Sequence, residues 1–179
     1  MADCIFCNAV KGTTKLEKVY EDKELLAVIH PRGSAPGHLL VIPKKHYQIF
    51  EQVPDYEITH IFDVVNKLSV AVFEGMKAAG TNIIIQNGVA GGQEVPHVVV
   101  HIIPRSEGDS LDFQWDPKQM TQEEMSSIEL KLKDAASEIE PFEKQKKKQP
   151  VKIEKKQETK LSDEEEKENY MIKQLERIP

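Results

Sequence analysis

One long helical pattern interrupts a series of short apolar segments, and this order limits what the chain can fold into. Between residues 54 and 79 the apolar side chains recur every three or four positions, as in an amphipathic helix. We expect Asp55 to cap this helix and Gly80 to end it. Shorter apolar segments, bounded by glycine or proline, are typical of strands. They lie at 16–22, 24–30 and 38–43 before the helix, and at 82–87 and 97–103 after it.

Three strands before the helix and two after it predict an α+β domain. The strands that are close in sequence favour antiparallel pairing, so we expect a five-stranded antiparallel sheet with the long helix packed on it. The segment HVVVHII at 97–103 is apolar on both faces, which indicates a strand with neighbours on both sides. A second helix is predicted at 121–140, where Thr121 and Glu124 fit a capping box.

The composition turns to Lys, Glu and Gln after Pro141. We therefore expect a domain at 1–115, a C-terminal helical extension at 116–140, and a charged, disordered tail at 141–179 that includes a short helix at 162–177. The formal net charge of −6 argues against a molecule built to coat nucleic acid. The lysine-rich block at 144–160 leaves nucleic-acid binding by the tail open, although the acidic run at 163–168 is an equally good internal partner.

No segment of the sequence resembles a membrane span or a secretory signal. No apolar run reaches the roughly 20 residues that cross a bilayer, and the first ten residues, MADCIFCNAV, lack the pattern of a signal peptide. Cys4 and Cys7 are the only cysteines, and a structural disulfide is the less favoured state for them in a protein without an export signal. We expect a cytoplasmic protein that makes no membrane contact.

The spacing C-x-x-C of Cys4 and Cys7 is half of a zinc site, or else two small buried side chains near a terminus. His46 follows the third predicted strand, and His97 begins the fifth. If these two strands are close in the sheet, both imidazoles can reach the thiols. Two thiolates and two imidazoles suit Zn²⁺, and four protein ligands make a closed site, which is structural rather than catalytic.

His97 and His101 lie on the same face of one predicted strand. Their Cα atoms are roughly 13 Å apart at the usual rise per residue, too far for one ion with Zn–N bonds of about 2 Å. His101 is therefore free for another role, or it is a core histidine bonded to a backbone carbonyl. The glycine-rich loop at 87–93 leads toward this strand. Its backbone N–H groups, with Asn87 and Gln93, suit a phosphate, although a plain turn is the default for such a loop.

Several motifs, in order, resemble those of the histidine-triad (HIT) family of nucleotide hydrolases and transferases. They are CIFC (4–7), KVYED (18–22), APGHLLVIPKKH (35–46), NGVAGGQ (87–93) and VPHVVVHIIPR (95–105). The resemblance covers about residues 3–115. It implies a homodimer whose sheets join, and a nucleotide whose α-phosphate lies at the last strand. His97 matches the first histidine of the family pattern His-φ-His-φ-His and His101 the third, which implies that His101 contacts the phosphate or the leaving group.

The resemblance also implies roles for residues outside that strand. Asn87, Gly92 and Gln93 match loop positions that contact phosphate, and Trp115 resembles a tryptophan near the active site of some members. His30 stands where the family has an acidic or amide residue that binds the ribose hydroxyls. The zinc-bearing members resemble this chain at Cys4, Cys7, His46 and His97.

Two positions depart from the family pattern in ways that affect the chemistry. Val99 replaces the nucleophilic histidine and has no lone pair with which to attack phosphorus. The loss of a nucleophile can cost on the order of 10⁶ in turnover. Glu94 replaces a small hydroxyl residue, and its carboxylate repels a phosphate.

These departures leave two hypotheses for the function. The first is a slow hydrolase of dinucleoside polyphosphates or nucleoside phosphoramidates, in which water attacks directly and His101 acts as acid or base. The alternative is a zinc-stabilised module that binds a nucleotide, or serves as an interaction platform, without catalysis.

Overall fold

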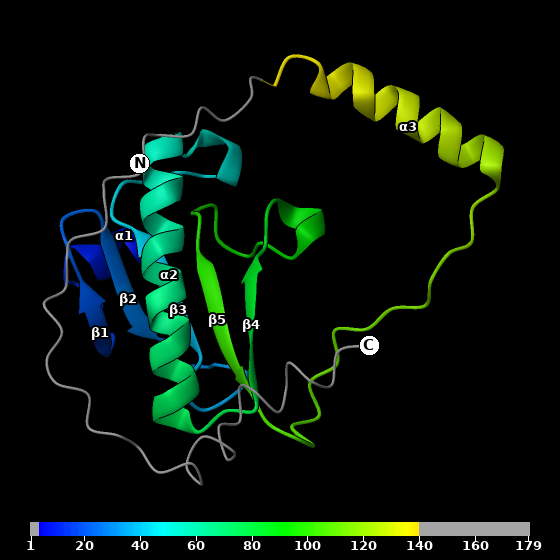
Figure 1. Ribbon diagram of the computed structural model, residues 1–179. Helices are drawn as coiled ribbons and strands as arrows, with labels where there is room; N and C mark the ends of the chain where they lie inside the picture. Colours follow the sequence, from blue (N-terminus) through cyan, green and yellow to red (C-terminus); the bar gives the residue numbers. More distant parts are fainter. Residues whose placement is uncertain (1–3, 140–179) are drawn as a thin grey trace, which may run out of the picture. The chain divides into compact units, whose positions relative to one another are not determined.

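The computed structural model describes residues 4–139, and these form the predicted α+β architecture (Figure 1). The sheet has the order β1-β2-β3-β5-β4, with every neighbouring pair antiparallel. Its strands are β1 (Lys18–Glu21), β2 (Leu25–Ile29), β3 (Leu39–Pro43), β4 (Gly80–Ile85) and β5 (Val100–Arg105). The strand that carries His101 thus lies between two others, as predicted. The expected tail at 141–179, with its helix at 162–177, lies outside the described residues.

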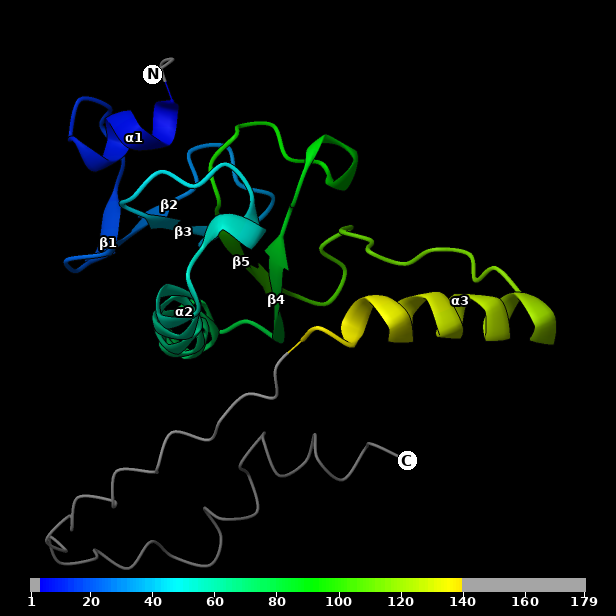
Figure 2. The same ribbon diagram turned by 90° about the horizontal axis from the view of Figure 1, so that it is seen from above.

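The long helix α2 (Asp55–Met76) covers one face of the sheet (Figures 1 and 2). Its apolar stripe packs on alternate residues of the strands, because side chains two apart on a strand share a face. The helix contributes Ile61, Val64, Val65, Leu68 and Val72; the strands and the segment before β5 contribute Leu25, Ala27, Leu39, Val41, Val98, Val100 and Ile102. This cluster is the larger of the two hydrophobic cores.

The expected ends of α2 were wrong. Pro54 occupies the N-cap position in an extended conformation without a side-chain cap, and Asp55 is already the first helical residue. At the other end Lys77 adopts a left-handed conformation with φ 52°, and its N–H bonds to the carbonyl of Glu74. The helix therefore ends before the glycine, and Gly80 begins β4 instead.

A short helix, α1 (Ile5–Val10), lies on the face of the sheet opposite α2 (Figure 2). The residues that pack beneath it alternate with those of the larger core: Ala9, Leu26, Val28, Leu40, Ile42 and Val99. The sequence analysis did not predict this helix, which carries the C-x-x-C motif. Val99, just before β5, and the alternate residues His101 and Ile103 therefore lie on the α1 side of the sheet and not on the α2 side.

A second compact unit begins at Pro117, directly after Asp116. It contains α3 (Gln122–Ala136), which starts with the predicted capping box: Thr121 accepts from the N–H of Glu124, and the Glu124 carboxylate accepts from the N–H of Thr121. The helix is shorter than expected, and none of its residues is buried. Across residues 4–139, no helix is both long and apolar enough to span a bilayer.

Candidate metal centre and histidine pocket

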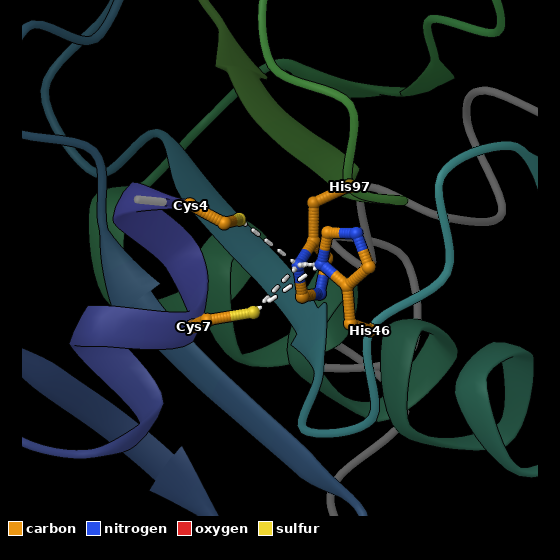
Figure 3. A group of neighbouring side chains, drawn as sticks. All are labelled: Cys4, Cys7, His46 and His97. Atoms are coloured by element: carbon orange, nitrogen blue, oxygen red, sulfur yellow. Dashed lines mark hydrogen bonds between the residues drawn. The ribbon is translucent and has the colours of Figure 1, made fainter. Parts of the chain in front are cut away.

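Four side chains that are distant in sequence meet at one point beside α1 (Figure 3). Their potential ligand atoms all lie within 4.8 Å of one another. Cys4 precedes α1 and Cys7 lies within it, His46 follows β3, and His97 lies just before β5. The structure thus brings together all four residues that the sequence suggested as metal ligands.

The distances between these ligand atoms match the edges of a tetrahedral zinc site. With Zn–S of about 2.3 Å and Zn–N of about 2.0 Å, a tetrahedron has S···N edges of about 3.6 Å and an N···N edge of about 3.3 Å. Cys4 Sγ lies 3.4 Å from His97 Nδ1, and Cys7 Sγ lies 3.3 Å from His46 Nδ1. The two Nδ1 atoms are 3.2 Å apart. The donor set and its spacing therefore fit zinc.

The backbone of β3 sets the orientation of the His97 ring. The carbonyl of Pro43 accepts from His97 Nε2 at 2.9 Å, so the proton of the neutral ring is on Nε2 and the lone pair of Nδ1 faces the thiols. Burial lowers the pKa of His97, which keeps the ring neutral. A hydrogen bond from the second ring nitrogen is the usual support for a metal-bound histidine.

A pocket of about 360 Å³ opens beside the metal cluster, on the same face of the sheet. Val99, His101 and Ile103 form part of its wall, because successive odd residues of this strand face the same side. Val99 is only 7% exposed and packs in the smaller core. The position between the two histidines therefore contributes an apolar side chain to the pocket and no nucleophile.

His38, which the sequence analysis did not single out, also lines this pocket. It precedes β3 and is 6% exposed. Its Nε2 lies 3.1 Å from His101 Nδ1. A signal was available: once β3 and β5 are neighbours, His38 shares a face with Leu40 and Ile42, the face on which His101 lies.

Hydrogen bonds fix the tautomers of His38 and His101. The backbone N–H of Ser34 donates to His38 Nδ1 at 3.1 Å, so the proton of the neutral His38 ring is on Nε2. This Nε2–H then donates to Nδ1 of His101. The proton of neutral His101 is consequently on Nε2, which has no partner among the described residues. His101 therefore offers the pocket a hydrogen-bond donor rather than a lone pair.

His30 adds a third imidazole to the wall of the pocket. Its ring centroid lies 4.7 Å from that of His38 and 6.3 Å from that of His101. The backbone N–H of Arg32 donates to His30 Nδ1 at 3.0 Å, so neutral His30 also bears its proton on Nε2. All three rings are thus held in the same tautomer.

Burial is the main cause of low basicity in this cluster. It lowers the pKa of His38 to about 4, with a further contribution from the charges of His30 and His101. Burial, and then the charge of His30, lowers the pKa of His101. Burial and Arg32 lower the pKa of His30, although the carboxylate of Glu94 acts in the opposite direction. At neutral pH the pocket therefore holds neutral imidazoles.

The glycine-rich loop uses most of its donors internally. The N–H groups of Gly91, Gly92 and Gln93 bond to carbonyls within the loop, and that of Gly88 bonds to Gln93 Oε1. Asn87 accepts from the N–H of Phe50 and donates to the Glu51 carboxylate. Gln93 lines the pocket, whereas Asn87 and Gly92 do not. The phosphate contacts expected for these three residues stay predictions.

An aromatic side chain after β5 reaches the pocket, but it is not the expected one. Trp115 is 84% exposed and is not part of the pocket wall. Phe113 lines the pocket, with the guanidinium of Arg105 5.4 Å from its ring centroid. Arg105 is itself held by Asp109 at 2.6 and 2.9 Å and by Asn82 at 2.5 Å. The segment that carries Phe113 is therefore fastened to the sheet.

More than half of this chain matches a known protein family. Residues 11–108 match the HIT domain family. An uncharacterized HIT-like protein of Methanocaldococcus jannaschii is 44% identical over 106 residues, which is 59% of this chain and 81% of that protein. An adenylylsulfatase of Arabidopsis thaliana is 35% identical over 109 residues, 61% of this chain, and the match spans only 55% of the relative.

A solved structure supports both the fold and the metal interpretation. The zinc-bound histidine-triad family protein of Mycobacterium smegmatis has a TM-score of 0.59 and 33% sequence identity to this chain. The alignment covers 75% of this chain and 97% of that one. At this identity the likeness extends beyond the general fold. The four-residue cluster described above could accordingly hold a metal ion.

Proposed function

This chain belongs to the HIT family, and on that premise we propose that its histidine pocket binds a nucleotide and hydrolyses it slowly, without a covalent intermediate. The substrate class is a nucleotide with a cleavable bond to phosphorus, either a dinucleoside polyphosphate or a nucleoside phosphoramidate. The single observation that carries the proposal is the free Nε2–H of His101, fixed by His38 and directed into a pocket large enough for a ligand.

His101 Nε2–H is suited to a phosphoryl oxygen. A hydrogen bond to an anionic oxygen is stronger than one between neutral groups, and here the donor is already oriented before the ligand arrives. Arg32 lies on the same wall and adds positive charge, and Phe113 adds an aromatic face for a base. A nucleotide suits this pocket, because the hydrogen-bond donors can bind its phosphate and the aromatic ring can contact its base.

Val99 removes the covalent route, so water is the nucleophile. The water oxygen bonds to phosphorus, the bond from phosphorus to the leaving group breaks, and the proton of the water passes to solvent. The leaving group takes the Nε2 proton of a doubly protonated His101, which becomes neutral with its remaining proton on Nδ1. Because Nδ1 then carries a proton, His38 must hold its own proton on Nδ1 instead of Nε2, which breaks its hydrogen bond from the Ser34 N–H. Because burial and the charge of His30 lower the pKa of His101, this acid form is scarce at pH 7. Turnover is therefore slow and rises as the pH falls.

A second candidate function is nucleotide binding without turnover. The observation that favours it is that His30, His38 and His101 are all Nε2–H tautomers, so none of them presents a lone pair to the pocket. A pocket of donors holds an anion well but supplies neither nucleophile nor base. Glu94 is the one carboxylate among the described residues that line it.

We propose that Cys4, Cys7, His46 and His97 bind a structural Zn²⁺. All four positions of a tetrahedral site would come from the protein, which leaves none for a substrate. The ion would fasten α1 and the segment after β3 to the beginning of β5, beside the pocket. Neither cysteine forms a disulfide in the structure, which leaves both sulfur atoms available to a metal ion.

The proposed homodimer would form along β4. This strand is the edge of the sheet beside β5, and Ile83 on it is 45% exposed. A second copy could extend the sheet through that edge by backbone hydrogen bonds. Nucleic-acid binding through the lysines at 144–160 stays a prediction that falls outside the described residues.

One experiment separates hydrolysis from binding. The zinc-loaded full-length protein is titrated with AMP by calorimetry and incubated with diadenosine polyphosphates and with adenosine phosphoramidate, and product is followed by chromatography from pH 5 to 8. We expect binding, and slow product formation that increases toward pH 5 and is lost in His101→Asn. Binding without product over days would favour the binding module, and an absence of binding would refute both functions.

A further inference from the structure

We propose that His30 and Arg32 form a second anion-binding subsite, so that the preferred ligand carries two phosphoryl groups, one on His101 and one on His30 and Arg32. This inference rests on the proposed function, because it takes the first phosphoryl group to be bound by His101. It adds a ligand class: nucleoside diphosphates or bisphosphates rather than monophosphates.

The first donor of the subsite is fixed by the backbone. His30 lies directly after β2, and its Nδ1 accepts the N–H of Arg32 at 3.0 Å. The neutral ring therefore has its proton on Nε2, and no hydrogen bond from Nε2 to another residue occurs within the described residues. Because His30 lines the pocket, its Nε2–H is available to an anion there.

Arg32 supplies the charge of the subsite. Its side chain lines the same pocket and is exposed. Over residues 4–139, no carboxylate lies within ion-pair distance of it, whereas Arg105 is held by Asp109. A guanidinium that is free of protein partners can bind a phosphoryl group through two parallel N–H donors. Arg32 is therefore a candidate anion ligand rather than a structural ion pair.

The position of His101 separates it from this pair. His101 lies within the sheet, where it pairs with Leu40 of β3 on one side and Ile84 of β4 on the other. Arg32 belongs to the exposed connection between β2 and β3. The centroid of the His30 ring lies 6.3 Å from that of His101, and the ring accepts the backbone N–H of Arg32. A phosphoryl group on His101 thus leaves the guanidinium of Arg32 for a second group.

Glu94 is the carboxylate of the pocket lining. A ligand with two phosphoryl groups binds here only if the positive charges of the pocket outweigh the negative charge of Glu94. Glu94 opposes an anion, and Arg32 alone cancels its charge. A second phosphoryl group gains from the His30 Nε2–H and favours protonation of that ring, which Glu94 also favours. The subsite therefore needs both His30 and Arg32.

Calorimetric titration of the full-length, zinc-loaded protein with AMP, ADP and adenosine 3′,5′-bisphosphate tests the subsite. We expect at least one of the two doubly phosphorylated ligands to bind about tenfold more tightly than AMP. Arg32→Ala and His30→Asn should each abolish most of this advantage, measured as the ratio of the affinity for the doubly phosphorylated ligand to the affinity for AMP in the same variant. Lys67→Ala, an exposed charge change on α2 across the sheet, is the control and should change nothing.

The outcomes distinguish this inference from the proposed function. Equal affinity for all three ligands, or an equal loss for all three in Arg32→Ala, would overturn the second subsite while the nucleotide pocket stands. No binding of any ligand would overturn both. His101→Asn should weaken all three ligands by a similar factor; a loss confined to the doubly phosphorylated ones would reverse the assignment of the two subsites and so contradict it.

Discussion

His97 and His101 are the same side chain on the same face of one chain segment, four residues apart, yet their surroundings give them opposite properties. The Pro43 carbonyl accepts the Nε2 proton of His97, which leaves Nδ1 as a lone pair beside two thiols. His38 donates to Nδ1 of His101, which leaves Nε2–H as a donor in the pocket. The partner of one ring nitrogen thus decides whether the other can bind a cation or an anion.

Val99 lies between these two histidines, and replacing it is the strongest test of the difference. Val99→His should introduce the missing lone pair in a pocket that already has the donor of His101. We expect hydrolysis of an adenosine phosphoramidate to increase by several orders of magnitude, with about 10⁶-fold as the upper bound set by the loss of a nucleophile. The measurement is a single-turnover assay that also looks for nucleotidyl-protein by mass spectrometry.

Val99→Asn is the matched control, since it adds a polar side chain of similar size to the same buried position without a nucleophile. It should show no gain, and Val99→His combined with His101→Asn should lose most of it. Both polar variants will be less stable, because Val99 packs in the smaller core. A folded Val99→His protein that binds nucleotide but is no faster would show that the pocket lacks more than the nucleophile.

The second test removes one of the four proposed metal ligands, which include His97. Cys7→Ser should lower the zinc content and the free energy of unfolding, the latter by about 4 kcal/mol when free zinc exceeds its dissociation constant about 1,000-fold. Elemental analysis and urea unfolding with and without chelator measure the two effects. Lys15→Ala, an exposed charge change in the segment after the same helix, is the control. If Cys7→Ser and wild type unfold at the same urea concentration with zinc present, the cluster is not a structural zinc site.

Most of the fold and the two cysteines of the metal cluster follow from local patterns in the sequence. Strand periodicity, the stripe of α2 and the capping box at Thr121 need only near neighbours along the chain. The motif C-x-x-C is also local, and the two histidines that complete the cluster follow from the adjacency of the third and fifth strands. The ends of α2 could not be placed, because Lys77 adopts a left-handed conformation that the sequence does not signal.

The pocket was only partly predictable, because its chemistry depends on contacts across the sheet. His101 was identified, but the partner of its ring was not, since the register that pairs Leu40 with His101 is a property of the folded sheet. The glycine loop has the composition of a phosphate-binding loop, but the sequence does not show that several of its N–H groups bond to carbonyls within the loop. Phe113 reaches the pocket through the contacts of Arg105, and these do not appear as a motif.

The third test concerns the pocket around His101 and measures how the free energy of unfolding depends on pH. Folding lowers the pKa of His38 from its ordinary value of 6.5 to about 4. Between these two values the unfolded chain takes up a proton that the folded protein does not, so the free energy of unfolding falls as the pH falls. His38 should account for about 2 kcal/mol of this loss between pH 7 and pH 4.5. Above pH 6.5 it should contribute no pH dependence.

Comparison with His38→Asn isolates this contribution, because the variant keeps every other titrating group, including those of the metal cluster. Urea unfolding at several pH values should give a curve for His38→Asn that falls less steeply than that of wild type. Parallel curves would mean that the pKa of His38 is the same in the folded and the unfolded protein, so that burial does not lower it.

The last test, which has the smallest expected effect, asks whether the metal cluster at His97 and the pocket at His101 are independent of each other. Gln93 is the residue to change, because it contacts the His97 carbonyl and also lines the pocket. Its Oε1 accepts from Gly88, and its Nε2 donates to the Gln48 carbonyl at 2.7 Å, with the His97 carbonyl at 3.4 Å. Gln93→Ala should cost about 1 kcal/mol of unfolding free energy for the lost hydrogen bonds. Because both polar atoms are already engaged, nucleotide affinity and zinc content should change little.

Gln52→Ala is the control for Gln93→Ala, since Gln52 also supports the Gln48 backbone but does not line the pocket. A tenfold loss of nucleotide affinity in Gln93→Ala alone would mean that the side chain leaves its protein partners to contact phosphate, as the family resemblance implies. A loss of zinc alone would mean that the long contact with the His97 carbonyl positions a metal ligand. Loss of both nucleotide affinity and zinc in Gln93→Ala would show that the two ends of this segment are coupled, and His97 and His101 would then act as one site.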